Sequence, residues 1–131
     1  MTTAVDTNVL VRIITNDDAV QSAQAAAFLR AQASVFVGNT VLLELEWVLR
    51  SAYRIAARTI SATIRAIVAM PNVAIEDEAV VTRALAWYDR GMDFADSLHL
   101  ACAGSGRQFV TFDLALRRQA QRLGVRNLVH P

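Results

Sequence analysis

Four acidic residues of this chain lie within, or directly after, segments of mostly apolar residues. They are Asp6, Glu44, Asp96 and Asp113. Carboxylates near an apolar core are costly unless cationic side chains or a bound divalent cation compensate their charge. The chain contains no lysine, which narrows the first option to arginine. We therefore predict that the four carboxylates share a metal site.

Glu44 carries the strongest signal of the four. On a helix, its neighbours three and four residues away would be apolar: Val41, Trp47 and Val48. Glu46, by contrast, can pair with Arg50 four residues later on the same helix. This spacing predicts a surface ion pair for Glu46 and leaves Glu44 as the candidate metal ligand.

Asp6 ends an apolar run and precedes a predicted helix, so capping that helix is the alternative to metal binding. Asn8 could cap the same helix, which would leave Asp6 free to act as a ligand. Asn8 could also position a metal-bound water molecule. We expect Asp6 to be a ligand and Asn8 to be a supporting residue.

Asp93 and Asp96 open the predicted helix DFADSLHLACA, where the helix dipole favours negative charge. Asp93 suits the capping position, whereas Asp96 lies one turn into the helix and suits a metal ligand. His99 is three residues further on and within reach of Asp96, but a lone histidine is more often an ordinary hydrogen-bonded residue.

Asp113 follows one predicted strand and precedes a predicted helix, so a capping role is again the alternative. Thr111 would share a face with Asp113 if the strand continued, and its hydroxyl could hydrogen-bond a metal-bound water. We expect Asp113 to be a ligand and Thr111 to be a supporting residue.

The elements that must position these residues alternate along the chain. Five segments are predicted strands: 3–6, 34–37, 73–75, 108–111 and 126–129. Seven segments are predicted helices: 8–15, 18–32, 40–53, 61–70, 77–90, 93–103 and 114–123. Alternation of this kind predicts an α/β fold, with a central, mostly parallel sheet covered by helices on both faces. Ligands of such sheets gather at the carboxyl ends of the strands, where Asp6 and Asp113 are expected.

Length and composition predict a single domain over residues 1–131, because the chain has no repeat and no linker-like segment. A lone cysteine, Cys102, excludes an intrachain disulfide and favours the reducing cytoplasm. We find no signal peptide and no apolar run long enough to span a bilayer, so we expect a soluble protein without a membrane partner.

The net charge of +1 conceals an uneven distribution. Setting the four acids aside leaves 13 arginines against 8 acids, which is +5 for the rest of the chain. A negative pocket within a basic surface would hold cations and attract polyanions, as a nuclease requires. The alternative is that arginines such as Arg50, Arg54 and Arg58 simply form a solvated helix face.

Four motifs, in order, resemble those of the PIN-domain ribonucleases: AVDTNVLVR, VLLELEWVL, DFADSLHLACA and FVTFD. The similarity covers essentially the whole chain and is closest to the VapC-type toxins of bacterial toxin–antitoxin pairs. It implies a PIN-like three-layer sandwich, and an endoribonuclease that uses Mg²⁺ or Mn²⁺. The acidic cluster of the family falls on the four acids above, with Asn8 and Thr111 in support and Asp93 at a less constant position. The resemblance also implies a VapB-like antitoxin and homodimers.

Two other classes of protein compete with a nuclease. A non-catalytic nucleic-acid-binding or interaction domain would need no metal chemistry. A phospho-acceptor signalling domain has a similar topology, but it relies on a lysine that this chain lacks. Four aromatic residues are expected in the core or at an interface rather than as base-stacking platforms: Trp47, Trp87, Tyr88 and Phe94.

Overall fold

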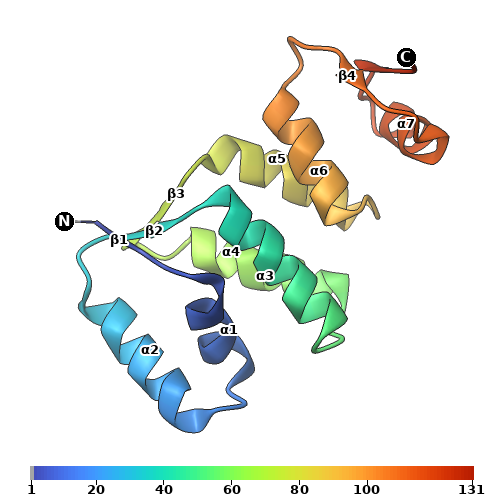
Figure 1. The fold of residues 1–131 in the computed structure, drawn as a ribbon. Coiled ribbons are helices and arrows are strands. Elements are labelled where there is room, and N and C mark those ends of the chain that lie inside the picture. The colour runs from blue at the N-terminus through green and yellow to red at the C-terminus, as the bar shows by residue number, and fades with distance from the viewer. Residues whose placement is uncertain (1) are drawn as a thin grey trace. The chain divides into compact units, whose positions relative to one another are not determined.

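The structure is a computed structural model that describes residues 2–131 and consists of two compact units (Figure 1). We call Met1–Glu78 the N-terminal unit and Ala79–Pro131 the C-terminal unit. Strands and helices alternate through both units. The two parallel sheets of the chain are divided between them, with strand order β1-β2-β3 in the first and β4-β5 in the second.

The N-terminal unit contains three strands and four helices. The strands are β1 (Thr3–Ala4), β2 (Val35–Val37) and β3 (Val73–Ile75). The helices are α1 (Thr7–Thr15), α2 (Ala19–Ala31), α3 (Asn39–Ser51) and α4 (Ala57–Val68). In β2, Val35 and Val37 are buried while Phe36 between them is exposed, as the two-residue period of a strand requires.

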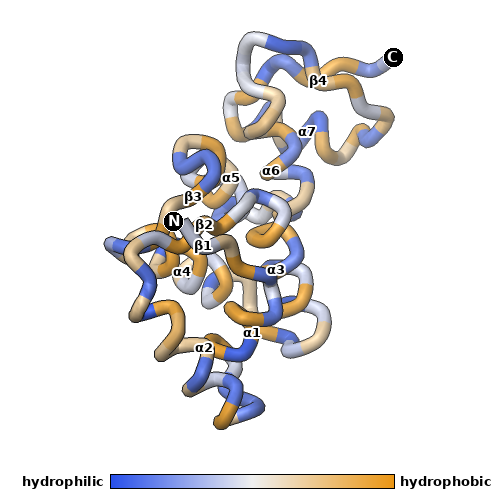
Figure 2. Tube along the Cα trace, turned by 60° about the vertical axis from the view of Figure 1, so that its left-hand side comes forward, coloured by the Kyte–Doolittle hydropathy of each residue, from blue (hydrophilic) through white to orange (hydrophobic). Residues whose placement is uncertain are grey.

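Apolar residues at helical spacing build the core of this unit. On α4, Ile60, Ile64 and Ile67 recur every three to four residues and all three are buried. Figure 2 shows the same division along the chain, where hydrophobic and hydrophilic segments alternate within the helices. The burial of this stripe therefore explains why the segment of α4 folds as an amphipathic helix.

The C-terminal unit contains the remaining elements. They are α5 (Glu78–Asp89), which begins at the last residue of the N-terminal unit, α6 (Phe94–Ala103), β4 (Phe109–Val110), α7 (Leu114–Arg122) and β5 (Leu128–Val129). A small apolar cluster joins α6 to α7 through Met92, Leu100, Leu116 and Ala120. The rings of Tyr88 and Phe94 pack edge to face, with their centroids 5.2 Å apart.

The predicted α/β class with parallel strand pairing is confirmed, and every predicted strand and helix is present. The largest error at a helix start is in α4, which begins at Ala57, four residues earlier than predicted. No side chain caps this helix, so the sequence offers no start signal there. We predicted one central sheet, whereas the described strands form two. Within residues 2–131, every helix is too short or too polar to traverse a bilayer.

Candidate functional site

Asp6 is the N-cap of α1 and is exposed to solvent. Its Oδ1 accepts a hydrogen bond of 2.8 Å from the backbone N–H of Thr7. Of the two capping residues that the sequence allowed, Asp6 caps the helix, because Asn8 lies inside α1 whereas Asp6 has the extended backbone of a capping residue. Capping occupies only one carboxylate oxygen of Asp6, so the other oxygen remains available to a cation.

The two glutamates of α3 have opposite environments. Glu44 is exposed, and its carboxylate makes no ion pair or hydrogen bond within residues 2–131. Glu46 is 2% exposed and accepts hydrogen bonds of 2.8 and 3.4 Å from Arg50. The predicted pairing of Glu46 with Arg50 is confirmed, but its predicted surface location was wrong. The reason is that Glu46 falls on the same helix face as the buried Leu42, Leu45 and Leu49.

Asp93 and Asp96 lie at the start of α6 in the C-terminal unit. Asp93 is the N-cap, as predicted, and its Oδ2 accepts a hydrogen bond of 3.1 Å from the backbone N–H of Asp96. The Asp96 carboxylate is partly buried and has no hydrogen-bond donor among the described residues. Partial burial raises the pKa of Asp96, the charges of Asp93 and Asp113 raise it further, and His99 lowers it. Asp93 and Asp113 therefore both lie close enough to Asp96 to act on it electrostatically.

Asp113 is the N-cap of α7, so this residue has the capping role that the sequence allowed as the alternative to metal binding. Its Oδ1 accepts a hydrogen bond of 2.9 Å from the backbone N–H of Leu116. Its own backbone N–H donates a hydrogen bond of 3.0 Å to Thr111 Oγ1. Thr111 thus positions the backbone of Asp113, while the predicted contact of its hydroxyl with a metal-bound water stays a prediction.

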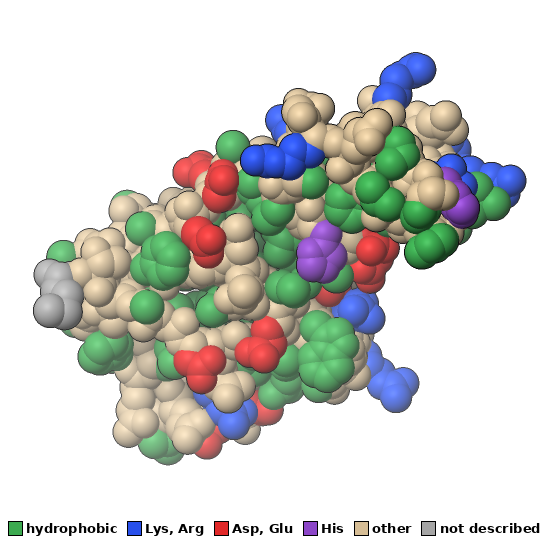
Figure 3. All heavy atoms as spheres, turned by 45° about the horizontal axis from the view of Figure 1, so that its top comes forward, with side chains coloured by type: hydrophobic (Ala, Val, Ile, Leu, Met, Phe, Trp, Pro, Cys, Tyr) green, Lys and Arg blue, Asp and Glu red, His purple; other side chains and the backbone are tan. Residues whose placement is uncertain are grey.

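The four candidate ligands are divided between the units, with Asp6 and Glu44 in the first and Asp96 and Asp113 in the second. None of them is paired with an arginine in the part of the chain that the structure describes. Acidic side chains reach the molecular surface, as Figure 3 shows. Among residues 2–131, no three His, Cys, Asp or Glu side chains are grouped closely enough to hold a metal ion. Their chemistry nevertheless suits a hard divalent cation, because each offers carboxylate oxygens that no guanidinium neutralises.

The aromatic residues divide into two groups. Tyr88 and Phe94 are buried in the core, as predicted. Trp47 is 59% exposed, so it does not belong to the core, and its predicted place at an interface stays a prediction. Trp87 is half-buried and lines a pocket of about 490 Å³ in the C-terminal unit. The sequence contained no signal for this pocket, since its walls come from residues about 40 positions apart.

Comparisons with known proteins bear on the family of the chain. No curated protein and no solved structure matches it. The PIN domain family matches residues 3–121, a span that includes every candidate site residue. PIN domains are generally metal-dependent nucleases, so this match supports a nuclease function. The chain belongs to the PIN-domain family.

Proposed function

We propose that this protein is a divalent-metal-dependent endoribonuclease and the toxin of a type II toxin–antitoxin pair. The observation that carries the proposal is the family match over residues 3–121, which includes all four acids. The absence of arginine partners for these acids among the described residues supports it further. Acids retained only for ion pairing would be expected to have such partners.

In the proposed mechanism, Asp6 and Asp96 would hold the principal Mg²⁺ or Mn²⁺, and Glu44 and Asp113 would complete the cluster or hold a second ion. A bound cation would lower the pKa of a water molecule and neutralise charge on the phosphate and the leaving oxygen. Three further residues would have supporting roles at this metal site: Asn8, Thr111 and Asp93.

The helix termini favour this arrangement. Asp6 and Asp113 cap helices, and Asp96 lies in the first turn of α6. The positive end of each helix dipole stabilises an ionised carboxylate there. The backbone N–H groups of Thr7 and Leu116 each hold one carboxylate oxygen in place and leave the second unpaired. These capping hydrogen bonds therefore orient the carboxylates of Asp6 and Asp113 and leave one oxygen of each available to a cation.

We further propose a VapB-like antitoxin as a partner, assembly as a homodimer, and action in the cytoplasm. An apolar pocket of about 230 Å³ in the N-terminal unit supports a protein partner. Its lining includes Leu10, Ile14, Leu29 and Val37. Phe28 on α2 is 55% exposed, although it is a large hydrophobic residue. The exposed ring of Phe28 suits contact with the apolar side chains of a partner segment.

The decisive experiment incubates the purified chain with a panel of single-stranded RNAs, with Mg²⁺, with Mn²⁺ and with EDTA. We expect cleavage with either metal and none with EDTA. Expression of the wild-type chain in a bacterial host should arrest growth, and expression of Asp96→Asn should not. RNA that is bound but never cleaved would overturn the nuclease proposal and indicate a non-catalytic nucleic-acid-binding domain.

A further inference from the structure

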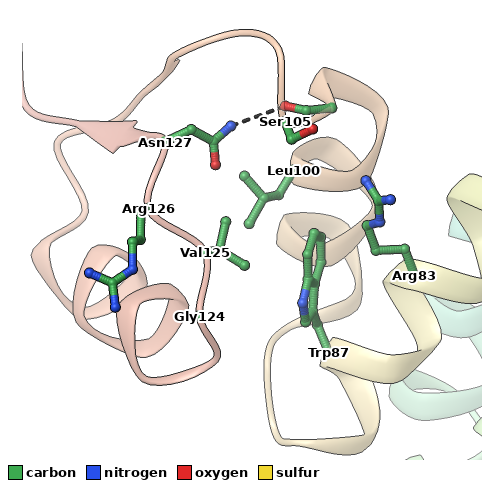
Figure 4. Close-up of a pocket in the computed structure, with 9 residues that line it drawn as sticks. Arg83, Trp87, Leu100, Ser105, Gly124, Val125, Arg126 and Asn127 are labelled. Atoms are coloured by element: carbon green, nitrogen blue, oxygen red, sulfur yellow. Dashed lines mark hydrogen bonds between the residues drawn. The ribbon is translucent and has the colours of Figure 1, made fainter.

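The pocket of about 490 Å³ lies entirely within the C-terminal unit and includes none of the four acids (Figure 4). Trp87 of α5 and Leu100 of α6 form one side, and residues 124–127 form the other. The volume falls within the range of about 300–1,000 Å³ that is typical of small-molecule sites. The pocket is therefore large enough for a ligand of the size of one nucleotide.

Asn127 gives the pocket a fixed polar group. Its Nδ2 donates hydrogen bonds to the backbone oxygens of Gly104, at 3.0 Å, and Arg107, at 2.7 Å. These two bonds determine the orientation of the amide, and Figure 4 shows its oxygen on the side of Val125. Within residues 2–131, no donor reaches this Oδ1, although the residue is partly buried. The amide oxygen is therefore held in a fixed orientation, in which it can accept a hydrogen bond from a ligand in the pocket.

Trp87 and Arg83 provide the opposite wall and rim. The half-buried indole of Trp87 packs against the apolar cluster that contains Leu100 and Leu116, and its N–H has no acceptor among the described residues. Arg83 lies one turn earlier on α5 and is exposed, and its guanidinium makes no ion pair within residues 2–131. Figure 4 places the two side chains next to each other, whereas Arg126 is turned away from Trp87.

We propose that this pocket binds one nucleotide of the RNA, with the base against Trp87 and a phosphate at Arg83. A nucleotide combines the three properties that the walls require: a flat aromatic ring, N–H groups on the edge of the base, and a negative charge. A purely apolar ligand would displace water from Asn127 Oδ1 and from the Trp87 N–H without replacing its hydrogen bonds. An acidic peptide would satisfy Arg83 but would offer no flat ring to the indole.

The inference relies on the proposed function only for the identity of the ligand as RNA. The binding test is independent of the acids, because it is made in EDTA with mononucleotides. The chain has two tryptophans, so Trp47→Phe leaves Trp87 as the only source of tryptophan fluorescence. In this full-length variant we titrate AMP, GMP, CMP, UMP and inorganic phosphate, and follow the emission of Trp87.

We expect saturable quenching by at least one nucleotide and a much weaker response to phosphate. Adding Arg83→Gln should weaken nucleotide binding by about tenfold, the size of one lost charge contact. Arg118→Gln is the matched control, since Arg118 is also an exposed arginine of this unit but does not line the pocket. It should leave nucleotide binding unchanged. Trp87→Phe in the otherwise wild-type chain keeps an apolar ring and should weaken RNA binding without unfolding the protein.

The possible outcomes separate the two proposals. Nucleotide binding without metal-dependent cleavage would support the pocket and overturn the nuclease. Metal-dependent cleavage without saturable quenching, or quenching that phosphate reproduces equally, would overturn the pocket and leave the nuclease intact. If Arg83→Gln instead shifts the monomer–dimer equilibrium and no nucleotide binds, the pocket is a contact between chains and the inference is wrong.

Discussion

The two units present their candidate ligands in different electrostatic settings. In the C-terminal unit, partial burial raises the pKa of Asp96, and the charges of Asp93 and Asp113 raise it further. In the N-terminal unit, Asp6 caps α1 and Glu44 is exposed on α3. The repulsion among the C-terminal acids is a local excess of negative charge that a cation would relieve.

The largest expected effect comes from removing the charge of a principal ligand. Asp6→Asn should reduce RNA cleavage by on the order of 100-fold or more, because the metal loses a charged ligand. Asparagine caps helices about as well as aspartate, so the free energy of unfolding should change little. Cleavage rates and urea unfolding curves measure the two quantities separately.

Asp18→Asn is the matched control for this substitution. Asp18 caps α2 by accepting a hydrogen bond from the backbone N–H of Gln21, so the chemical change is the same at a cap without a proposed catalytic role. Wild-type activity is expected. Equal losses from Asp6→Asn and Asp18→Asn would show that activity depends on capping rather than on metal binding.

The two glutamates of α3 should separate function from stability. Glu46→Ala removes the buried partner of Arg50 and should lower the free energy of unfolding by about 1–3 kcal/mol. Glu44→Gln should leave stability nearly unchanged, since Glu44 is exposed, yet impair cleavage. Urea unfolding with cleavage assays on both variants tests this contrast, and the reverse pattern would exclude Glu44 as a ligand.

Two substitutions separate the observed role of Asp113 as a helix cap from its proposed role as a metal ligand. Asp113→Ala removes the hydrogen bond to the Leu116 N–H and should destabilise the protein by about 1 kcal/mol. Asp113→Asn keeps a capping oxygen and removes the charge, so stability should be retained while cleavage falls. If Asp113→Asn cleaves RNA at the wild-type rate, Asp113 is a structural cap only.

The smallest expected effect is the pH dependence of stability without metal. The pKa of Asp96 is raised above its ordinary value of 3.8 in the folded protein, so the folded chain retains a proton that the unfolded chain has lost. The contribution of Asp96 to stability is therefore fully present below about pH 3.8 and is lost as the pH rises through the folded pKa. Asp96→Asn removes this loss, so the free energy of unfolding should rise by up to about 1 kcal/mol at neutral pH.

Thermal unfolding in EDTA at pH 3.5 and at pH 7 measures this effect. The melting temperature of the Asp96→Asn variant should exceed that of the wild type only at pH 7. Addition of Mg²⁺ should raise the melting temperature of the wild type and abolish the difference. An Asn variant that is less stable than the wild type at pH 7 without metal would contradict the proposed repulsion.

How much could be predicted from the sequence depended on how far apart along the chain the interacting residues lie. Asp93 as a cap and the pairing of Glu46 with Arg50 were predicted correctly, because both depend on residues three or four positions apart. The sequence left open whether Asp6 or Asn8 caps α1, since either residue type can cap and the backbone conformation decides. That the four acids share one metal stays a prediction, as does the single domain over residues 1–131.

The sequence by itself determined the alternation of strands and helices, because apolar spacing and capping residues act within one or two turns of the chain. It also identified the motifs of the PIN-domain family. Only the tertiary structure decided that Glu46 is buried and Glu44 exposed, since burial depends on which face of α3 meets segments distant in sequence. The same holds for the pocket, where Trp87 and Asn127 face a common space only because α5, α6 and residues 124–127 pack around it.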